Sequence, residues 1–168
     1  LYMEGHFESE NYFKKYKKDL INEFSFKFNP STENNIFKET IEEFNVVSIA
    51  FRKNRFSEFP DDVKNEKKLK KTKDFEKLTM KYIYRGVEYF ESKLKNPKFL
   101  VWSDSFENLN NYFDPKKFTF VKNDTKNKAV LDFYLMRQCK YFIVGPTTFH
   151  WWAAWLCDSE KKIIICPK

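Results

Sequence analysis

Histidine and cysteine are scarce in this chain, which limits the kinds of site it can build. The 168 residues include two histidines and three cysteines, Cys139, Cys157 and Cys166. The cysteines show neither close pairing nor the spacing of zinc ligands, and no acidic pair has metal-binding spacing. We therefore expect no metal, and free buried thiols in a reducing compartment.

Long apolar runs are also lacking. No stretch approaches the roughly 20 apolar residues that a membrane-spanning helix needs, and the start of the chain does not have the pattern of a signal peptide. We expect a bacterial protein of this kind in the cytoplasm or at the periphery of a membrane. A eukaryotic parent with an anchor would place it in the Golgi lumen.

Basic residues are in excess, with 31 Lys and Arg against 24 Asp and Glu and a net charge of +7. This charge favours anionic partners, namely nucleotide diphosphates, nucleic acid or a membrane surface. Much of the excess lies in residues 64–73 (KNEKKLKKTK), a run typical of a solvated loop or a helix end. The 20 Phe and 9 Tyr suit an AT-rich genome better than a base-stacking platform. Nucleic-acid binding is therefore the weakest hypothesis.

Strand and helix patterns alternate through most of the chain. Short apolar or β-branched runs predict strands at residues 46–51, 99–102, 118–121, 141–144 and 163–166. Helical spacing predicts helices at residues 8–26, 36–44, 74–94, 103–112, 128–138 and 148–157. This order predicts an α/β fold: a Rossmann-like parallel sheet with helices on both faces. We expect a helical arm at residues 1–44 and one Rossmann-like domain at residues 45–168.

Three loops should meet at the carboxyl edge of this sheet, where open α/β sheets bind ligands. They are residues 52–56, within a long polar loop predicted at 52–73, residues 103–105 and residues 145–149. Arg52 offers a guanidinium to phosphate, and its alternative is an ordinary salt bridge at a strand end. Thr147 and Thr148 follow a strand and a Gly-Pro turn, where they can cap a helix, bind phosphate, or do both. Asp104 can cap a short helix.

Several segments resemble a known enzyme family. Residues 135–156 (LMRQCKYFIVGPTTFHWWAAWL), followed by KKIIICPK, resemble the signature "LMSxCxHxIIANSSFSWWAAWL" of the α-1,2-fucosyltransferases in glycosyltransferase family eleven. Residues 5–13 (GHFESENYF) resemble that family's "GYFQSExYF". Residues 96–104 (NPKFLVWSD) resemble its "NPxFxVFSDD". The matches occur in the family's order and cover most of the chain.

The resemblance implies the C-terminal, donor-binding domain of a GT-B-type glycosyltransferase. The family's N-terminal half opens with a glycine-rich "GGLGNQMFQYA", and this chain has 3 Gly in all, so we expect it to correspond to the C-terminal half. The implied activity is transfer of fucose from GDP-fucose to a galactoside with inversion, without a metal or other cofactor. The implied partners are the nucleotide-sugar donor and the galactoside acceptor, with peripheral membrane contact and no nucleic acid.

The resemblance also implies roles for particular residues. The family motif "HxRRGDY" aligns with residues 50–56 (AFRKNRF), and its first arginine, taken to hold the donor diphosphate, matches Arg52. Lys53 takes the place of the second arginine and adds a positive charge near the expected diphosphate. Thr147 and Thr148 match two serines and, with Phe149, form the expected phosphate turn.

Two acidic residues complete the expected donor site. Asp104, at a strand end, could contact ribose, guanine or the acceptor. Asp132 matches an acidic position before the family's "LM" and could accept hydrogen bonds from a guanine edge or from a neighbouring loop. Arg55 occupies the position of the motif's acidic residue, so the acceptor base stays unassigned. Two hypotheses therefore remain open: a divergent transferase, or a catalytically degenerate relative that binds a nucleotide or a glycan.

The start of the last long helix is expected to be structural. His150, where the family has serine, is more typical of a structural or exposed residue than of a catalytic one. Trp151, Trp152 and Trp155 are spaced to wedge this helix against the sheet as core residues. Pro146 replaces a family asparagine and removes an amide that would touch a ligand.

Overall fold

The structure is a computed structural model that describes residues 9–25, 35–123 and 128–167. Within these ranges the helices and strands follow one another in the predicted alternation. In chain order they are α1 (Lys17–Glu23), α2 (Asn35–Glu43), β1 (Val46–Phe51), α3 (Glu66–Lys93), β2 (Lys98–Ser103), β3 (Phe118–Phe120), α4 (Lys128–Gln138), β4 (Tyr141–Ile143), α5 (Thr148–Leu156) and β5 (Ile163–Ile165).

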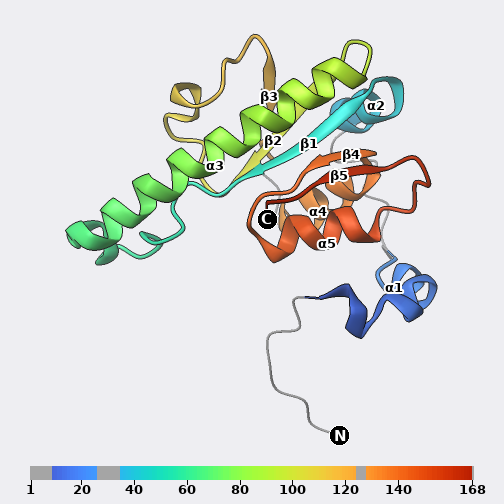
Figure 1. The fold of residues 1–168 in the computed structure, drawn as a ribbon, viewed down its shortest axis with the longest axis horizontal. Helices are drawn as coiled ribbons and strands as arrows, with labels where there is room; N and C mark the ends of the chain where they lie inside the picture. Colours follow the sequence, from blue (N-terminus) through green and yellow to red (C-terminus); the bar gives the residue numbers. More distant parts are fainter. Residues whose placement is uncertain (1–8, 26–34, 124–127, 168) are drawn as a thin grey trace, which may run out of the picture.

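The five strands form one parallel sheet in the order β3-β2-β1-β4-β5 (Figure 1). Helix α3 packs on one face, and α4 and α5 pack on the other. The predicted Rossmann-like α/β fold is therefore confirmed. Each strand lies within one or two residues of its predicted range. Residues 5–8 of the match at residues 5–13 lie outside the described residues.

Strand β1 is central because its sequence is apolar throughout. All six residues, VVSIAF, are buried, as expected for a parallel strand covered on both faces. Val47, Ile49 and Phe51 contribute to the core under α3, and Val46 to the core under α4 and α5. Alternate side chains of this strand therefore supply two separate cores.

The long loop predicted at residues 52–73 is too long by eight residues. Helix α3 begins at Glu66, because the Asn65 side chain caps it by accepting hydrogen bonds from the backbone N–H of Lys67 (3.1 Å) and Lys68 (3.2 Å). Lysine is a good helix former, so a cap is sufficient to start the helix within the basic run. The run is thus a helix end, and α3 extends well beyond the sheet (Figure 1).

The predicted helix at residues 8–26 is also shorter than expected. Two 3-10 turns precede α1, which begins at Lys17. Phe13, between these turns, stacks on Trp152 with ring centroids 4.9 Å apart, and Trp155 Nε1 donates to Glu10 Oε2 at 2.9 Å. Residues 9–25 of the arm therefore dock on α5, whereas α2 packs in the core with α4.

This docking corrects the role expected for the tryptophans. Trp151 and Trp152 are half-buried, whereas Ala153 and Ala154 line the core beneath α5. Small residues let the helix approach the sheet closely. Trp152 stacks on Phe13 of the arm, and Trp155, at 7% exposed, is covered by Phe13 and Glu10 rather than by the sheet. Trp151 packs against the core beneath α5, as predicted.

The cysteines are free, and Cys139 and Cys157 are buried as predicted. Burial raises the pKa of the Cys139 thiol above its usual range. Cys166 is exposed, contrary to the prediction, because it follows the short edge strand β5. None of the helices within the described ranges has the length and apolar character needed to cross a bilayer.

Candidate functional site

The site lies where the sheet changes direction. From β1 the chain moves outward to β2 and β3, and then crosses to β4 on the other side of β1. The carboxyl ends of β1 and β4 therefore diverge into different loops, and such a switch point is where open α/β sheets bind ligands. The two ends also touch closely: a Cβ on Gly145 would lie 2.4 Å from the Ala50 carbonyl oxygen, so only glycine fits.

A cavity of about 460 Å³ opens at this switch point. It brings together the ends of β1 and β2, the first turns of α4 and the start of α5. Its lining includes five of the predicted site residues: Arg52, Asp104, Asp132, Thr147 and Phe149. Lys53 and Thr148 are not among the lining residues. The expected meeting of the three loops is thus present in the fold.

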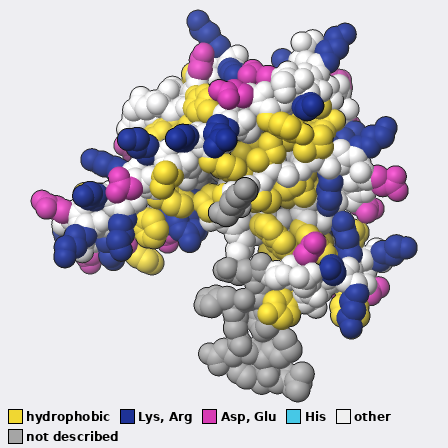
Figure 2. Space-filling model, viewed as in Figure 1, with side chains coloured by type: hydrophobic (Ala, Val, Ile, Leu, Met, Phe, Trp, Pro, Cys, Tyr) yellow, Lys and Arg dark blue, Asp and Glu magenta, His cyan; other side chains and the backbone are white. Residues whose placement is uncertain are grey.

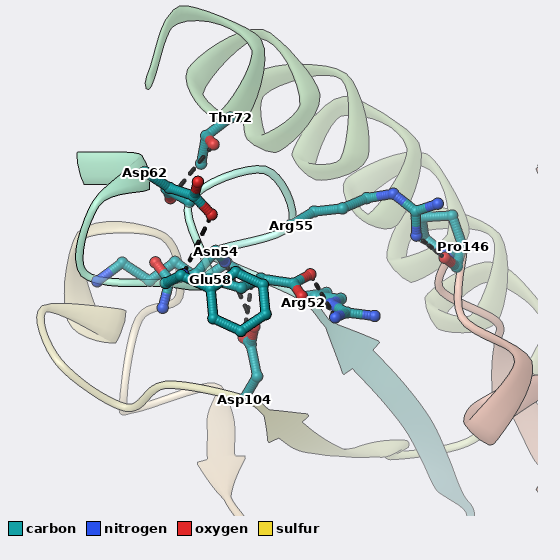
Figure 3. A network of polar contacts seen from close by, with 11 residues as sticks. Arg52, Asn54, Arg55, Glu58, Asp62, Thr72, Asp104 and Pro146 are labelled. Carbon is teal, nitrogen blue, oxygen red and sulfur yellow. Dashed lines mark hydrogen bonds and ion pairs between the residues drawn. The ribbon is translucent and has the colours of Figure 1, made fainter. Parts of the chain in front are cut away.

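Arg52 follows β1 directly and lines the cavity. Its Nη2 also forms an ion pair with the Glu58 carboxylate, and each side chain is 36% exposed (Figure 3). Both uses considered for Arg52 are therefore compatible with its position. The salt bridge is present, and Arg52 also lines the cavity.

Asp104 organises the loop after β1 rather than a helix. Its two carboxylate oxygens accept hydrogen bonds from the backbone N–H of Lys53 (2.8 Å) and Asn54 (3.3 Å). The helix predicted to begin at residues 103–105 is replaced by a 3-10 turn, Leu109–Asn111. The prediction of a cap at Asp104 is wrong because two unpaired loop amides bind the carboxylate instead.

Lys53 is turned toward the β2–β3 connection. Its Nζ donates to the Glu107 carbonyl at 2.6 Å, and the residue does not line the cavity. Its ammonium still lies in the loop after β1, but it is not aimed at the cavity as Arg52 is.

Arg55 ties the loop after β1 to the turn after β4, a role that sequence reasoning did not predict. Its Nη1 donates to the Pro146 carbonyl at 2.9 Å (Figure 3). The guanidinium also lies over the rings of Phe56 and Phe75, at 5.8 and 5.5 Å from their centroids. The one available signal was the basic residue at a position where the family motif is acidic.

Thr147 caps helix α5. Its Oγ1 accepts a hydrogen bond from the His150 backbone N–H at 3.2 Å, and Thr148 is the first residue of the helix. The cap satisfies one of the amides at the start of the helix, whose dipole favours an anion there. Because Thr147 also lines the cavity, the start of α5 faces the same space as Arg52.

His150 is a buried structural residue. It is 0% exposed, and its Nε2 lies 2.8 Å from Ser48 Oγ. Its Nδ1 accepts from the Gly145 N–H at 3.4 Å, which assigns the ring proton to Nε2 and makes the imidazole the donor to Ser48. Burial lowers the pKa of His150 to about 3, so the ring is neutral at physiological pH. The imidazole thereby fastens the turn after β4 to β1.

The α4 side of the cavity carries Asp132, which is half-buried. Asn123 Nδ2 donates to its carboxylate. Burial raises the pKa of Asp132, whereas Asn123 and the nearby Lys128 act in the opposite direction. A carboxylate held in this way can accept hydrogen bonds from a ligand.

Trp102, at the end of β2, also lines the cavity. It is 3% exposed, and its Nε1 is a buried donor without a hydrogen-bond partner. A buried donor without a partner is costly, so this atom is a candidate contact for a ligand acceptor. Its position in an apolar strand gave no sequence signal for such a role.

The described residues contain no group of three His, Cys, Asp or Glu side chains placed to hold a metal ion. The absence of a metal requirement stays a prediction. On the face drawn in Figure 2, Lys and Arg side chains are scattered among acidic ones rather than gathered into one stripe.

Comparison with known proteins agrees with the sequence resemblance. The family model described as "Glycosyl transferase family 11" matches residues 1–168. The chain is 28% identical over 168 residues to an alpha-1,2-colitosyltransferase of Escherichia coli, with 97% of this chain and 53% of that protein covered.

A shorter alignment links the chain to a second curated relative. It is 30% identical over 92 residues to the O-antigen biosynthesis glycosyltransferase WbnK of Escherichia coli, covering 54% of this chain and 30% of that protein. No solved structure matches the chain. The chain thus spans about half the length of the colitosyltransferase. The match over all 168 residues shows that this chain belongs to glycosyltransferase family 11.

Proposed function

We propose that the cavity at the switch point binds the GDP part of GDP-fucose, for transfer of fucose to a terminal galactoside with inversion. One observation carries the proposal: Arg52, the capped start of α5 at Thr147, and Asp132 line the same cavity. Together they offer a guanidinium and a helix dipole for a diphosphate and a carboxylate for a base edge. Membership of glycosyltransferase family 11 supports a nucleotide-sugar donor and a glycan acceptor.

The chemistry requires stabilisation of a departing diphosphate. The bond between the sugar carbon and the β-phosphate oxygen breaks, and its electron pair leaves with the phosphate. The oxygen of the acceptor hydroxyl attacks the opposite face of the sugar, and its proton passes to the acceptor base, which is unassigned. Arg52 donates hydrogen bonds to the phosphate oxygens, and the positive end of the α5 dipole adds to this field. These groups act most strongly when the negative charge is largest.

The nucleoside end is assigned to the α4 side of the cavity. Asp132 accepts hydrogen bonds from the guanine edge, and Trp102 Nε1 is available to donate to an oxygen of the nucleotide. Phe149, 41% exposed at the start of α5, provides an apolar surface beside them. In this proposal the base and the diphosphate occupy opposite sides of one cavity.

Calorimetric titration with GDP tests this proposal. Arg52→Ala removes a hydrogen bond to a charged group, which contributes about 1.5 to 3 kcal/mol, so we expect Kd to rise roughly 10- to 150-fold. The matched control is Lys64→Ala, which removes one exposed positive charge from the same loop and should leave Kd for GDP unchanged. An unchanged GDP affinity in Arg52→Ala would remove the assignment.

A second candidate function is a degenerate relative that binds the nucleotide without transferring the sugar. Arg55 favours it, because it stands where the family motif is acidic and is engaged with the Pro146 carbonyl. Incubation with GDP-fucose and a panel of galactosides separates the two functions. A fucosylated product establishes a transferase, whereas GDP binding without product establishes the degenerate relative.

A further inference from the structure

Glu58 holds the guanidinium that the proposed function assigns to the donor. Its carboxylate forms an ion pair with Arg52, six residues earlier in the same loop (Figure 3). The inference rests on that proposed function and concerns the same site. We propose that Glu58 and the diphosphate exchange places on Arg52, so that Glu58 opposes GDP binding.

The two anions compete because they use the same donors. Carboxylate and phosphate oxygens both pair with the N–H groups of a guanidinium. A carboxylate and a diphosphate on one guanidinium would also repel each other at close range. Occupation of Arg52 by one anion therefore disfavours the other.

The residues on each side of Glu58 are linked to α3, Ser57 through its side chain and Phe59 through Asp62. Thr72 Oγ1 donates to Ser57 Oγ at 3.3 Å, and the Phe59 N–H donates to Asp62 Oδ2 at 3.2 Å. Asp62 is in turn paired with Lys68 of α3, which lowers the pKa of the Asp62 carboxyl. Glu58 can therefore leave Arg52 by rotation of its side chain alone, without opening of the loop.

Rotation of a partly exposed side chain is fast, on the order of picoseconds to nanoseconds. The exchange therefore does not limit the rate of nucleotide binding. Its effect is on affinity, because a ligand that needs Arg52 must bind the fraction of molecules in which the guanidinium is free. Ion pairs as exposed as this one shift an equilibrium by a factor of about 1.5 to 5.

The experiment compares GDP with guanosine by calorimetry. Glu58→Gln should bind GDP about threefold more tightly than the parent chain. Guanosine lacks phosphate and does not need Arg52, so its affinity should stay the same. Asp61→Asn makes the same charge change in the same loop, but Asp61 pairs with Lys64 instead of Arg52, so GDP affinity should again stay the same.

A double-mutant cycle isolates the contact between the two residues. In an Arg52→Gln background, Glu58→Gln should no longer change GDP affinity. Weaker GDP binding by the single variant Glu58→Gln would show that Glu58 only supports Arg52. An equal increase in GDP affinity in Glu58→Gln and Asp61→Asn would show a general charge effect. Either result overturns the exchange.

The outcomes also separate this inference from the function on which it rests. If Arg52→Gln weakens GDP binding but Glu58→Gln leaves it unchanged, the exchange is overturned and the donor site stands. If Arg52→Gln leaves GDP binding unchanged, the donor site is overturned. If neither the parent chain nor Glu58→Gln binds GDP, both are overturned.

Discussion

The two faces of strand β1 differ in what they support. Toward α3 the strand presents the large side chains Val47, Ile49 and Phe51, which pack in a core rich in phenylalanine. Its other face includes Ser48, bonded to His150, and Ala50, which lines the cavity. The difference teaches that small and polar side chains on one face leave room for a ligand, while the other face supplies packing energy.

The largest effect is expected on the α3 face. Phe90→Ala removes a fully buried ring and should lower the free energy of unfolding by about 3 to 5 kcal/mol. Phe90 does not line the cavity, so GDP affinity of the folded protein should change by less than about 0.4 kcal/mol. Urea unfolding and calorimetry measure the two quantities. A large loss of affinity in the folded variant would remove the distinction between the faces.

The opposite result is expected for Asp132→Asn on the cavity side. Loss of the charged acceptor should weaken GDP binding by about 1.5 to 3 kcal/mol. Burial raises the pKa of Asp132, so the charged form destabilises the fold, and the variant should be at least as stable as the parent at pH 7. Calorimetry and thermal unfolding test this pair of effects. Lower stability with unchanged affinity would assign Asp132 to packing.

His150, which contacts the cavity face of β1, should make the free energy of unfolding depend on pH. The unfolded chain takes up a proton on this histidine near its ordinary pKa of 6.5, but the folded chain does so only near pH 3. Between these values the unfolded state binds more protons, so the free energy of unfolding should fall by about 1.4 kcal/mol per pH unit as pH decreases. Denaturant titrations from pH 6.5 to 4.5 measure the slope. His150→Gln should reduce it, and equal slopes would contradict the assignment.

The smallest effect is expected outside the two cores, where the arm docks on α5. Trp152→Ala removes the ring stacked on Phe13, an interaction of about 0.5 to 1.5 kcal/mol beyond the area buried. Amide exchange in residues 9–25 should therefore accelerate roughly 2- to 12-fold, with little change around β1. Trp152→Phe keeps an aromatic ring and should show less acceleration. Exchange that is equal in all three proteins would mean that the stack does not hold the arm.

The strands and the position of the site could be predicted from the sequence because both depend on local patterns. The apolar run of β1 and the Gly-Pro turn after β4 mark strand ends, and parallel topology brings such ends to one edge. The predicted residues Arg52 and Thr147 meet there for this reason. Family motifs added the chemical identity that pattern alone does not supply.

Other features depended on capping and on contacts in the folded chain, which local sequence patterns do not determine. The lysine-rich run was compatible with a loop or a helix end, and the Asn65 cap decided between them. The contact of Arg55 with Pro146 joins residues 91 positions apart, and the pairing of Glu58 with Arg52 depends on the fold of a polar loop. The orientation of the tryptophans depended on the arm, which covers the outer side of α5.

Gly145 has a practical consequence for engineering. Any side chain at this position would push its first carbon against the Ala50 carbonyl, so a library that varies residue 145 would mostly yield misfolded clones. Diversity at the cavity belongs instead at Ala129 and Phe149, which line it from α4 and α5. The close contact between β1 and the turn after β4 would then stay unchanged while the lining of the cavity is redesigned.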